Sequence, residues 1–200
     1  MTIGVAVLGS TGSVGCSTLE VLWLNRERFR VVVLAARSNV ELLLAQCLRF
    51  APEWAVLESP EAARELERRL GVEGSRTRVG AGAGAIAQLA ADSAVDYVMA
   101  AISGAAGLSS TLAAAAAGKR LLLANKESAV MAGALLMSAV RAGGAELIPI
   151  DSEHNAIFQC LPAGARPGER PAVHGPSWRT AQAFSSQLRN GPRTAQLSRP

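Results

Sequence analysis

Short apolar runs alternate with amphipathic segments along the first 150 residues of the chain. The runs are rich in Val, Ile, Leu and Ala and are bounded by glycine, proline or polar residues, which is typical of strands buried on both faces. They predict strands at residues 3–8, 29–36, 54–57, 77–79, 95–100, 120–124 and 145–150.

The segments between these runs carry helical signals. Leu43, Cys47 and Phe50 recur at the spacing of one helix face. Pro60 opens a charged segment and suits the first turn of a helix. A turn is expected at 80–84, and helices are expected at residues 16–24, 40–50, 60–70, 85–91, 108–117 and 128–141.

This alternation predicts an α/β fold: a doubly wound, mostly parallel, Rossmann-like sheet with helices on both faces. Ligands of such sheets bind beyond the carboxyl ends of the strands. Each of the polar clusters there would alone fit a solvated loop, but together they favour a binding site. The clusters are residues 9–15, 37–39, 125–127 and 151–153.

The loop at residues 9–15 reads GSTGSVG and follows the first predicted strand directly. Its glycines allow a sharp turn and a close approach to a ligand. Backbone N–H groups at the start of the following helix meet the positive end of the helix dipole, which suits a phosphate. The spacing is G-x-x-G-x-x-G rather than G-x-G-x-x-G, so a plain strand-to-helix turn stays open as an alternative.

Composition narrows the class of protein. The 200 residues suit one domain, or one domain plus a fragment, and the net charge of +4 comes largely from the C-terminal end. No basic patch in the main body indicates a nucleic-acid partner, and a G-K-[ST] phosphate loop is missing. The cysteines Cys16, Cys47 and Cys160 are widely spaced, which predicts a reducing, cytoplasmic setting with buried thiols.

Residues 97–118 contain no charged side chain and are long enough to span a bilayer. The stretch is mostly Ala, Gly and Ser, with Gly104 and Gly107 inside it. A strand, a turn and a helix explain it better than a membrane span, so we expect no membrane partner.

The residues after the second predicted strand indicate which nicotinamide cofactor is preferred. A fold that binds NAD usually has an acidic residue there, which holds the ribose 2′-hydroxyl. Arg37 and Ser38 stand in its place, and an arginine accommodates a 2′-phosphate, so the sequence favours NADP(H). The alternative is that Arg37 is a surface charge.

Asp151 and Glu153 lie two residues apart after the last predicted strand, so in extended geometry their carboxylates share one side. Two carboxylates suit Mg²⁺ or Mn²⁺, and Ser152 between them suits a substrate oxygen. For this tripeptide alone, a helix N-cap with an acidic first turn is the simpler interpretation.

Lys126 lies at a strand end between Asn125 and Glu127. A lysine there can pair with a substrate oxyanion. The alternative is a charge at a helix start, although a helix N-terminus disfavours a cation.

Four motifs together resemble the 1-deoxy-D-xylulose 5-phosphate reductoisomerase family, from Thr2 to about Pro162. The motifs are LGSTGSVGCSTL (8–19), MAAISGAAGL (99–108), LLANKES (122–128) and PIDSEHNAIFQ (149–159). The resemblance implies conversion of 1-deoxy-D-xylulose 5-phosphate to 2-C-methyl-D-erythritol 4-phosphate in isoprenoid precursor synthesis, with NADPH and either Mn²⁺ or Mg²⁺.

The resemblance also implies roles for individual residues. The implied cofactor contacts are Thr11, Gly12, Ser13 and Val14 at the phosphates, Arg37, Ser38 and Asn39 towards the 2′-phosphate, and Asn125 and Glu127. The implied substrate contacts are Lys126 and Ser152, and the implied metal ligands are Asp151 and Glu153. Arg37 and Ser38 stand where family members often carry Gly and Lys.

The resemblance ends near Pro162. Residues 163–200 hold six arginines, one acidic residue and no lysine, which predicts a disordered tail. We therefore expect an NADP-binding domain at 1–150, the start of a catalytic domain at 151–162 and a divergent tail at 163–200. The chain is expected to be truncated and inactive alone, with the family's homodimer interface lost. The alternative is an NADPH-binding remnant without catalytic activity.

Overall fold

The computed structural model describes residues 2–150 and Asn155. Three of the predicted site residues, Asp151, Ser152 and Glu153, lie outside the described residues, and so does the predicted disordered tail. The fold described below is therefore that of the predicted NADP-binding domain.

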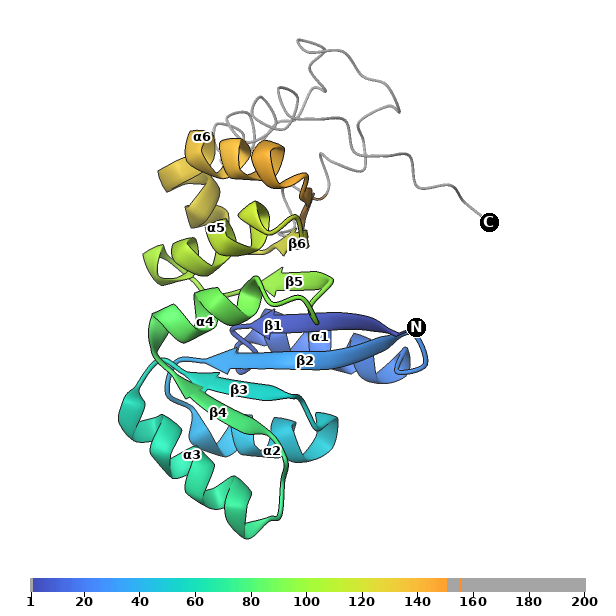
Figure 1. Cartoon of the computed structure of the whole chain (residues 1–200), viewed down its shortest axis with the longest axis vertical. Coiled ribbons are helices and arrows are strands. Elements are labelled where there is room, and N and C mark those ends of the chain that lie inside the picture. The colour runs from blue at the N-terminus through green and yellow to red at the C-terminus, as the bar shows by residue number, and fades with distance from the viewer. Residues whose placement is uncertain (1, 151–154, 156–200) are drawn as a thin grey trace.

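The described residues form strands and helices in strict alternation (Figure 1). The strands are β1 (Ile3–Leu8), β2 (Phe29–Ala36), β3 (Trp54–Leu57), β4 (Arg78–Ala81), β5 (Tyr97–Ala100), β6 (Arg120–Leu123) and β7 (Glu146–Pro149). The helices are α1 (Ser13–Leu24), α2 (Val40–Phe50), α3 (Pro60–Val72), α4 (Gly82–Ala90), α5 (Leu108–Ala116) and α6 (Lys126–Gly143), with the 3₁₀ turn η1 (Ala105–Gly107) before α5.

Within the described part of the chain, seven strands make one sheet in the order β4-β3-β2-β1-β5-β6-β7. Every neighbouring pair is parallel, so the expected mostly parallel sheet is parallel throughout. The strand order reverses direction at β1, whose neighbours are β2 and β5. In a doubly wound sheet this reversal opens a crevice at the carboxyl ends, where ligands bind.

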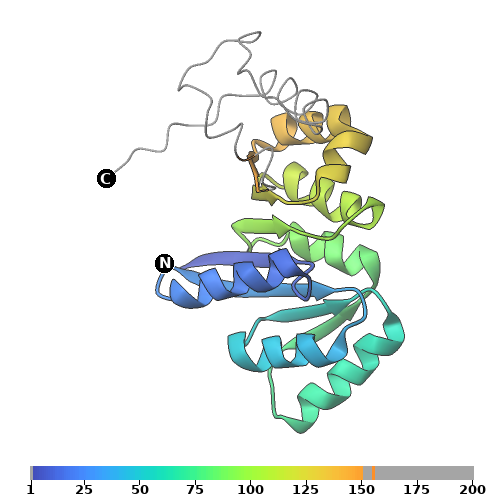
Figure 2. The same ribbon diagram turned by 180° about the vertical axis from the view of Figure 1, so that it is seen from behind.

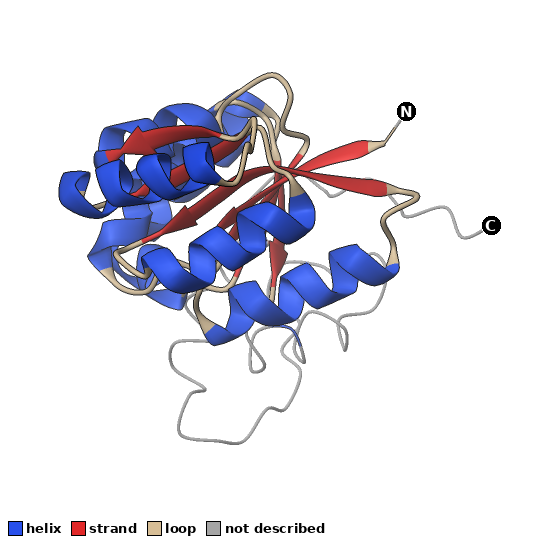
Figure 3. Cartoon of the chain, turned by 90° about the horizontal axis from the view of Figure 1, so that it is seen from below, coloured by secondary structure: helices blue, strands red, loops and turns tan. Residues whose placement is uncertain are grey.

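Helices cover both faces of the sheet, as expected (Figures 2 and 3). Each face has its own hydrophobic core. Successive residues of β1 serve the two cores alternately: Val5 and Val7 pack with α1, α2 and α3, whereas Ala6 and Leu8 pack with α4, α5 and α6. Fully or nearly buried helix residues include Leu19, Leu43 and Leu66 on one face and Ala114, Leu136 and Met137 on the other.

The structure corrects three predicted helix starts. Helix α1 begins at Ser13 rather than residue 16, α4 begins at Gly82 inside the expected turn, and α6 begins at Lys126 rather than residue 128. The apolar period marks only the packed face, whereas these helices begin with the polar or glycine residues Ser13, Gly82 and Lys126. The 3₁₀ turn η1 is also an element that the apolar pattern does not indicate.

Residues 97–118 contain β5, η1 and α5, so the predicted strand, turn and helix are confirmed. Among the described residues, no helix has both the length and the apolar character needed to cross a membrane.

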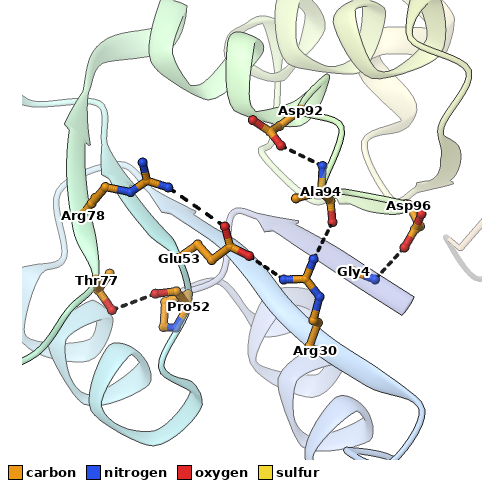
Figure 4. A network of polar contacts seen from close by, with 9 residues as sticks. All are labelled: Gly4, Arg30, Pro52, Glu53, Thr77, Arg78, Asp92, Ala94 and Asp96. Carbon is orange, nitrogen blue, oxygen red and sulfur yellow. Dashed lines mark hydrogen bonds and ion pairs between the residues drawn. The ribbon is translucent and has the colours of Figure 1, made fainter. Parts of the chain in front are cut away.

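A polar network joins the amino ends of the strands, at the edge of the sheet opposite the carboxyl ends (Figure 4). Arg30 of β2 pairs with Glu53 at 2.5 Å and donates to the carbonyl of Ala94 at 3.2 Å. The Asp96 carboxylate accepts from the backbone N–H of Gly4 at 2.7 Å. Exposed ion pairs of this kind contribute about 0.2–1 kcal/mol, so the two cores dominate stability.

The free energy of unfolding that is lost when a leucine is replaced by alanine should depend on whether the leucine lies in one of these cores. Leu34 is fully buried in β2, whereas Leu24 at the end of α1 is 77 % exposed. We expect Leu34→Ala to lower the free energy of unfolding by about 3–5 kcal/mol, because it leaves a cavity in a packed core. Leu24→Ala, the matched control, should change it by less than about 0.5 kcal/mol. Urea titration measures both, and equal losses would contradict the assignment of the core.

Candidate functional site

The glycine loop turns sharply at the end of β1. Gly9 has φ +86°, and a Cβ built on it would lie 2.5 Å from the carbonyl oxygen of Ala101 at the end of β5. The N–H of Gly9 donates to the carbonyl of Ala35 in β2 at 2.8 Å. The first glycine therefore lies between the two neighbours of β1, where any side chain would clash.

The other two glycines of the loop have different surroundings. A Cβ on Gly15 would lie 2.2 Å from the carbonyl oxygen of Gly9 and 2.6 Å from the Cα of Ser10, because α1 packs directly on the loop. A Cβ on Gly12 would meet only the Gly9 oxygen, at 3.4 Å. One glycine thus makes the turn, one leaves an open side, and one lets the helix pack closely, which is the division of roles in a dinucleotide-binding loop.

Helix α1 begins without a side-chain cap. Its N-cap residue is Gly12, and its first turn contains no acidic side chain. Ser13 and Val14 are exposed, and Thr11 before them is half-buried. The first N–H groups of a helix have no partner within the helix, so an uncapped and accessible start offers donors to an anion.

The residues after β2 lie next to this loop, because Leu8 of β1 pairs with Ala35 of β2. Arg37 and Ser38 are exposed there, as a role at the far end of a cofactor requires. Asn39 is the N-cap of α2, and its Oδ1 accepts from the N–H of Leu42 at 3.1 Å. This residue therefore has a structural contact in addition to its predicted role at the cofactor.

Asn125 ties together the loops on the other side of the crevice. It is only 2 % exposed, and its Oδ1 caps α6 by accepting from the N–H of Ser128 at 3.2 Å. Its Nδ2 donates to the carbonyl of Gly104, after β5, at 3.0 Å. In the described structure, both ends of this amide are therefore engaged with the protein.

The next two residues begin α6. Lys126 is exposed and Glu127 is half-buried, and both belong to the first turn of this helix. The first backbone N–H groups of a helix have no partner within the helix and carry partial positive charge, like the ammonium of Lys126 beside them. This ammonium is therefore available to an anionic group rather than to a neighbouring carbonyl.

The fold thus brings three of the four predicted clusters to one edge of the sheet, after β1, β2 and β6. The fourth cluster, which holds Asp151, Ser152 and Glu153, lies outside the described residues. Within the described part of the chain, no three His, Cys, Asp or Glu side chains gather as a metal site.

Sequence reasoning missed the burial of two polar residues at the glycine loop, one within the loop and one beneath it. Ser10 is fully buried, and Gln46 of α2 is 6 % exposed. The Nε2 of Gln46 donates to the carbonyl oxygen of Ser10 at 2.8 Å. A signal was available, because Gln46 stands on the apolar helix face of Leu43 and Cys47, where an amide needs a polar partner. Burial also raises the pKa of the Cys47 thiol to about 12, so this neighbour stays neutral.

The sequence and structure were compared with known proteins. The family model for 1-deoxy-D-xylulose 5-phosphate reductoisomerase matches residues 5–133. The chain belongs to this family. Curated reductoisomerases from Janthinobacterium sp. (strain Marseille) and Aromatoleum aromaticum are 55 % and 56 % identical to it, over 86 % and 84 % of the chain. The chain spans 43 % and 42 % of the length of these relatives.

Solved structures of the same family share the fold. A DOX-P reductoisomerase in complex with NADPH, fosmidomycin and magnesium superposes with a TM-score of 0.79 at 49 % identity, covering 81 % of this chain and 40 % of that one. The reductoisomerase from Zymomonas mobilis in complex with NADPH gives 0.78 at 45 % identity, covering 82 % and 42 %. The Rossmann-like prediction and the family resemblance are confirmed.

Two glycines of the loop should respond differently to a methyl group. We expect Gly15→Ala to lower the free energy of unfolding by about 2–4 kcal/mol, because its Cβ overlaps the backbone of Gly9 and Ser10. Gly12→Ala is the matched control and should cost less than about 1 kcal/mol, since it meets one atom at ordinary contact distance. Thermal or urea unfolding measures both. A tolerated Gly15→Ala would contradict the close packing of α1 on the loop.

Proposed function

We propose that the described domain binds NADPH for the reduction that the family name denotes, the conversion of 1-deoxy-D-xylulose 5-phosphate to 2-C-methyl-D-erythritol 4-phosphate. The observation that carries the proposal is the glycine loop, which leads into the uncapped start of α1 beside the crevice between β1 and β5. The NADPH complexes of the related structures support it. Because the chain spans less than half of its relatives, the complete reaction is proposed rather than assigned.

The residues of this chain have distinct parts in the proposal. Backbone N–H groups of the glycine loop and the first turn of α1 would hold the pyrophosphate, where the helix dipole favours negative charge. Arg37 and Ser38 would bind the 2′-phosphate, with Asn39 beside them. The loop residues proposed for the pyrophosphate are Thr11, Gly12, Ser13 and Val14.

On the other side of the crevice, Glu127 and Asn125 would contact the cofactor. The hydrogen bonds of Asn125 to the protein mean that it would also fix the start of α6. Lys126 would pair with an oxygen of the sugar phosphate, and Ser152 would contact the same substrate. When bound, NADPH supplies the hydride.

Asp151 and Glu153 would hold Mg²⁺ or Mn²⁺, which polarises substrate oxygens when it is bound. In the sequence, these two residues follow β7, which lies next to β6 in the sheet. Lys126 begins the helix that follows β6. A magnesium complex among the related structures supports a divalent cation.

We further propose that the 200-residue polypeptide binds NADPH without turning over substrate. Hydride transfer needs the reacting carbon fixed against the nicotinamide in a closed, dry site. The described domain offers the cofactor side of such a site. The same polypeptide is expected to lack the homodimer contacts implied by the family resemblance. The alternative is an NADPH-binding remnant without catalytic activity, which substrate-dependent turnover would exclude.

The first prediction of this proposal concerns cofactor choice. The chain should bind NADPH in preference to NADH, because Arg37 stands where an acid would hold a 2′-hydroxyl. Arg37→Asp should reduce this discrimination by about 1–3 kcal/mol, the size of a charge-assisted contact. Calorimetry with both cofactors measures it. Equal affinity of the unsubstituted chain for the two cofactors would refute the assignment of Arg37.

A second prediction concerns the metal. Mn²⁺ binding by the polypeptide should be weak, since two carboxylates leave most of a six-oxygen coordination shell to water. Asp151→Ala should weaken it further. Electron paramagnetic resonance counts bound Mn²⁺, and a tight site that survives Asp151→Ala would place the metal elsewhere.

The third prediction is the absence of turnover. NADPH consumption that depends on 1-deoxy-D-xylulose 5-phosphate should stay at background in the purified polypeptide, because loss of positioning costs many powers of ten in rate. The control is Glu153→Ala, which should abolish any activity that belongs to this chain and leave contaminant activity unchanged. Turnover sensitive to Glu153→Ala would overturn the expectation of inactivity and exclude the remnant.

A further inference from the structure

A buried amide on α2 holds the glycine loop from beneath. Gln46 is 6 % exposed, and its Nε2 donates to the carbonyl oxygen of Ser10 at 2.8 Å, across 36 residues of sequence. The Sγ of Cys16 lies 3.5 Å from the same oxygen. The Ser10 carbonyl therefore has a strong partner on the side of the loop that faces the core.

The N–H side of Ser10 is fixed as well. Its backbone N–H donates to the carbonyl of Ala35 at 2.9 Å, and the N–H of Gly9 donates to that oxygen at 2.8 Å. Ser10 is thus anchored to β2 through its N–H and to α2 through its C=O. The residue is fully buried, so water does not replace either contact.

The peptide group between Ser10 and Thr11 is planar, so fixing the Ser10 carbonyl also fixes the direction of the Thr11 N–H. In a trans peptide, the carbonyl of one residue and the N–H of the next point in opposite directions. Because the Ser10 carbonyl points towards Gln46, the N–H of Thr11 points away from it. No acceptor among the described residues receives this N–H.

We infer that Gln46 is a positioning residue that aims the N–H of Thr11 at the cofactor's pyrophosphate. The inference rests on the proposed binding of NADPH and adds a residue that touches no ligand itself. Without the amide, the Ser10 carbonyl keeps, among the described residues, only the weak contact of the Cys16 Sγ, so the direction of the Thr11 N–H is less firmly fixed.

Stability of the fold does not explain the amide of Gln46. The Oε1 of Gln46 and the Oγ of Ser10 are buried without a hydrogen-bond partner in the described structure. An unpartnered buried oxygen destabilises the fold, and a methionine of similar length would fill the same space without that oxygen, leaving the Ser10 carbonyl with only the Cys16 Sγ within the described part of the chain. Gln46→Met therefore separates the two roles: it removes the contact to the loop and keeps the core packed.

The first test measures NADPH binding and stability together. Gln46→Met should raise the Kd for NADPH about tenfold, equivalent to about 1.4 kcal/mol, with only a small change in the urea midpoint, because loss of the hydrogen bond to Ser10 and removal of the unpartnered Oε1 oppose each other. Cys47→Ala is the matched control on the same helix, since Cys47 is buried in the core and, among the described residues, its side chain makes no hydrogen bond to the loop. It should lower the urea midpoint and leave the Kd within about twofold. An unchanged Kd for Gln46→Met would overturn the inference.

The second test needs no cofactor, so it decides the inference even if the chain fails to bind NADPH and the proposed function falls. Amide hydrogen exchange by nuclear magnetic resonance should be faster at Gly9 and Ser10 in Gln46→Met than in the unsubstituted chain, and unchanged in Cys47→Ala. Equal exchange in Gln46→Met would contradict the anchoring. If Gln46→Met does not fold, the side-chain amide protons of Gln46 in the unsubstituted chain decide: protection supports the hydrogen bond to Ser10, and rapid exchange refutes it.

Discussion

The arrangement of the whole crevice depends on close packing of backbone against backbone at the glycine loop. At the end of β1, the glycine loop passes so close to Ala101 that Gly9 has no room for a Cβ, and α1 lies so close to the loop that Gly15 has none either. Three segments from different parts of the chain therefore meet with only backbone between them. Because the sheet, the loop and the helix are all in close contact here, the orientation of α1 and the position of β5 depend on each other.

The polar groups at the amino ends of the strands are arranged differently from those at the carboxyl ends. At the amino ends of the strands, Arg30 pairs with Glu53 and donates to a backbone carbonyl, and Asp96 accepts from a backbone N–H, so these polar groups are satisfied within the protein. At the carboxyl ends, Asn125 secures the loops from inside while the start of α1 is left without a cap. The start of α1 therefore keeps free donors at the carboxyl ends, which is where ligands of open α/β sheets bind.

Much of the fold could be predicted because its signals are local. The runs at 3–8 and 31–36 are apolar throughout, which identifies strands buried on both faces, and the predicted clusters after β1, β2 and β6 do share one edge. Contacts between distant residues left no such signal. The bond between Gln46 and Ser10 joins residues 36 apart, and only an amide on an apolar helix face pointed to it. The double role of Asn125 likewise needs Gly104 to be next to it in space.

The central position of β1 has a consequence for how the chain reaches this fold. Of the strands described, β1 leaves the ribosome first, and its neighbour β2 follows soon after. Its other neighbour does not, since Gly4 and Asp96 meet across 92 residues. Closing so long a segment costs entropy before the contact returns any free energy, and contacts of this range slow folding. The half of the sheet from β4 to β1 can therefore assemble first, with one side of β1 open until β5 arrives to complete the crevice.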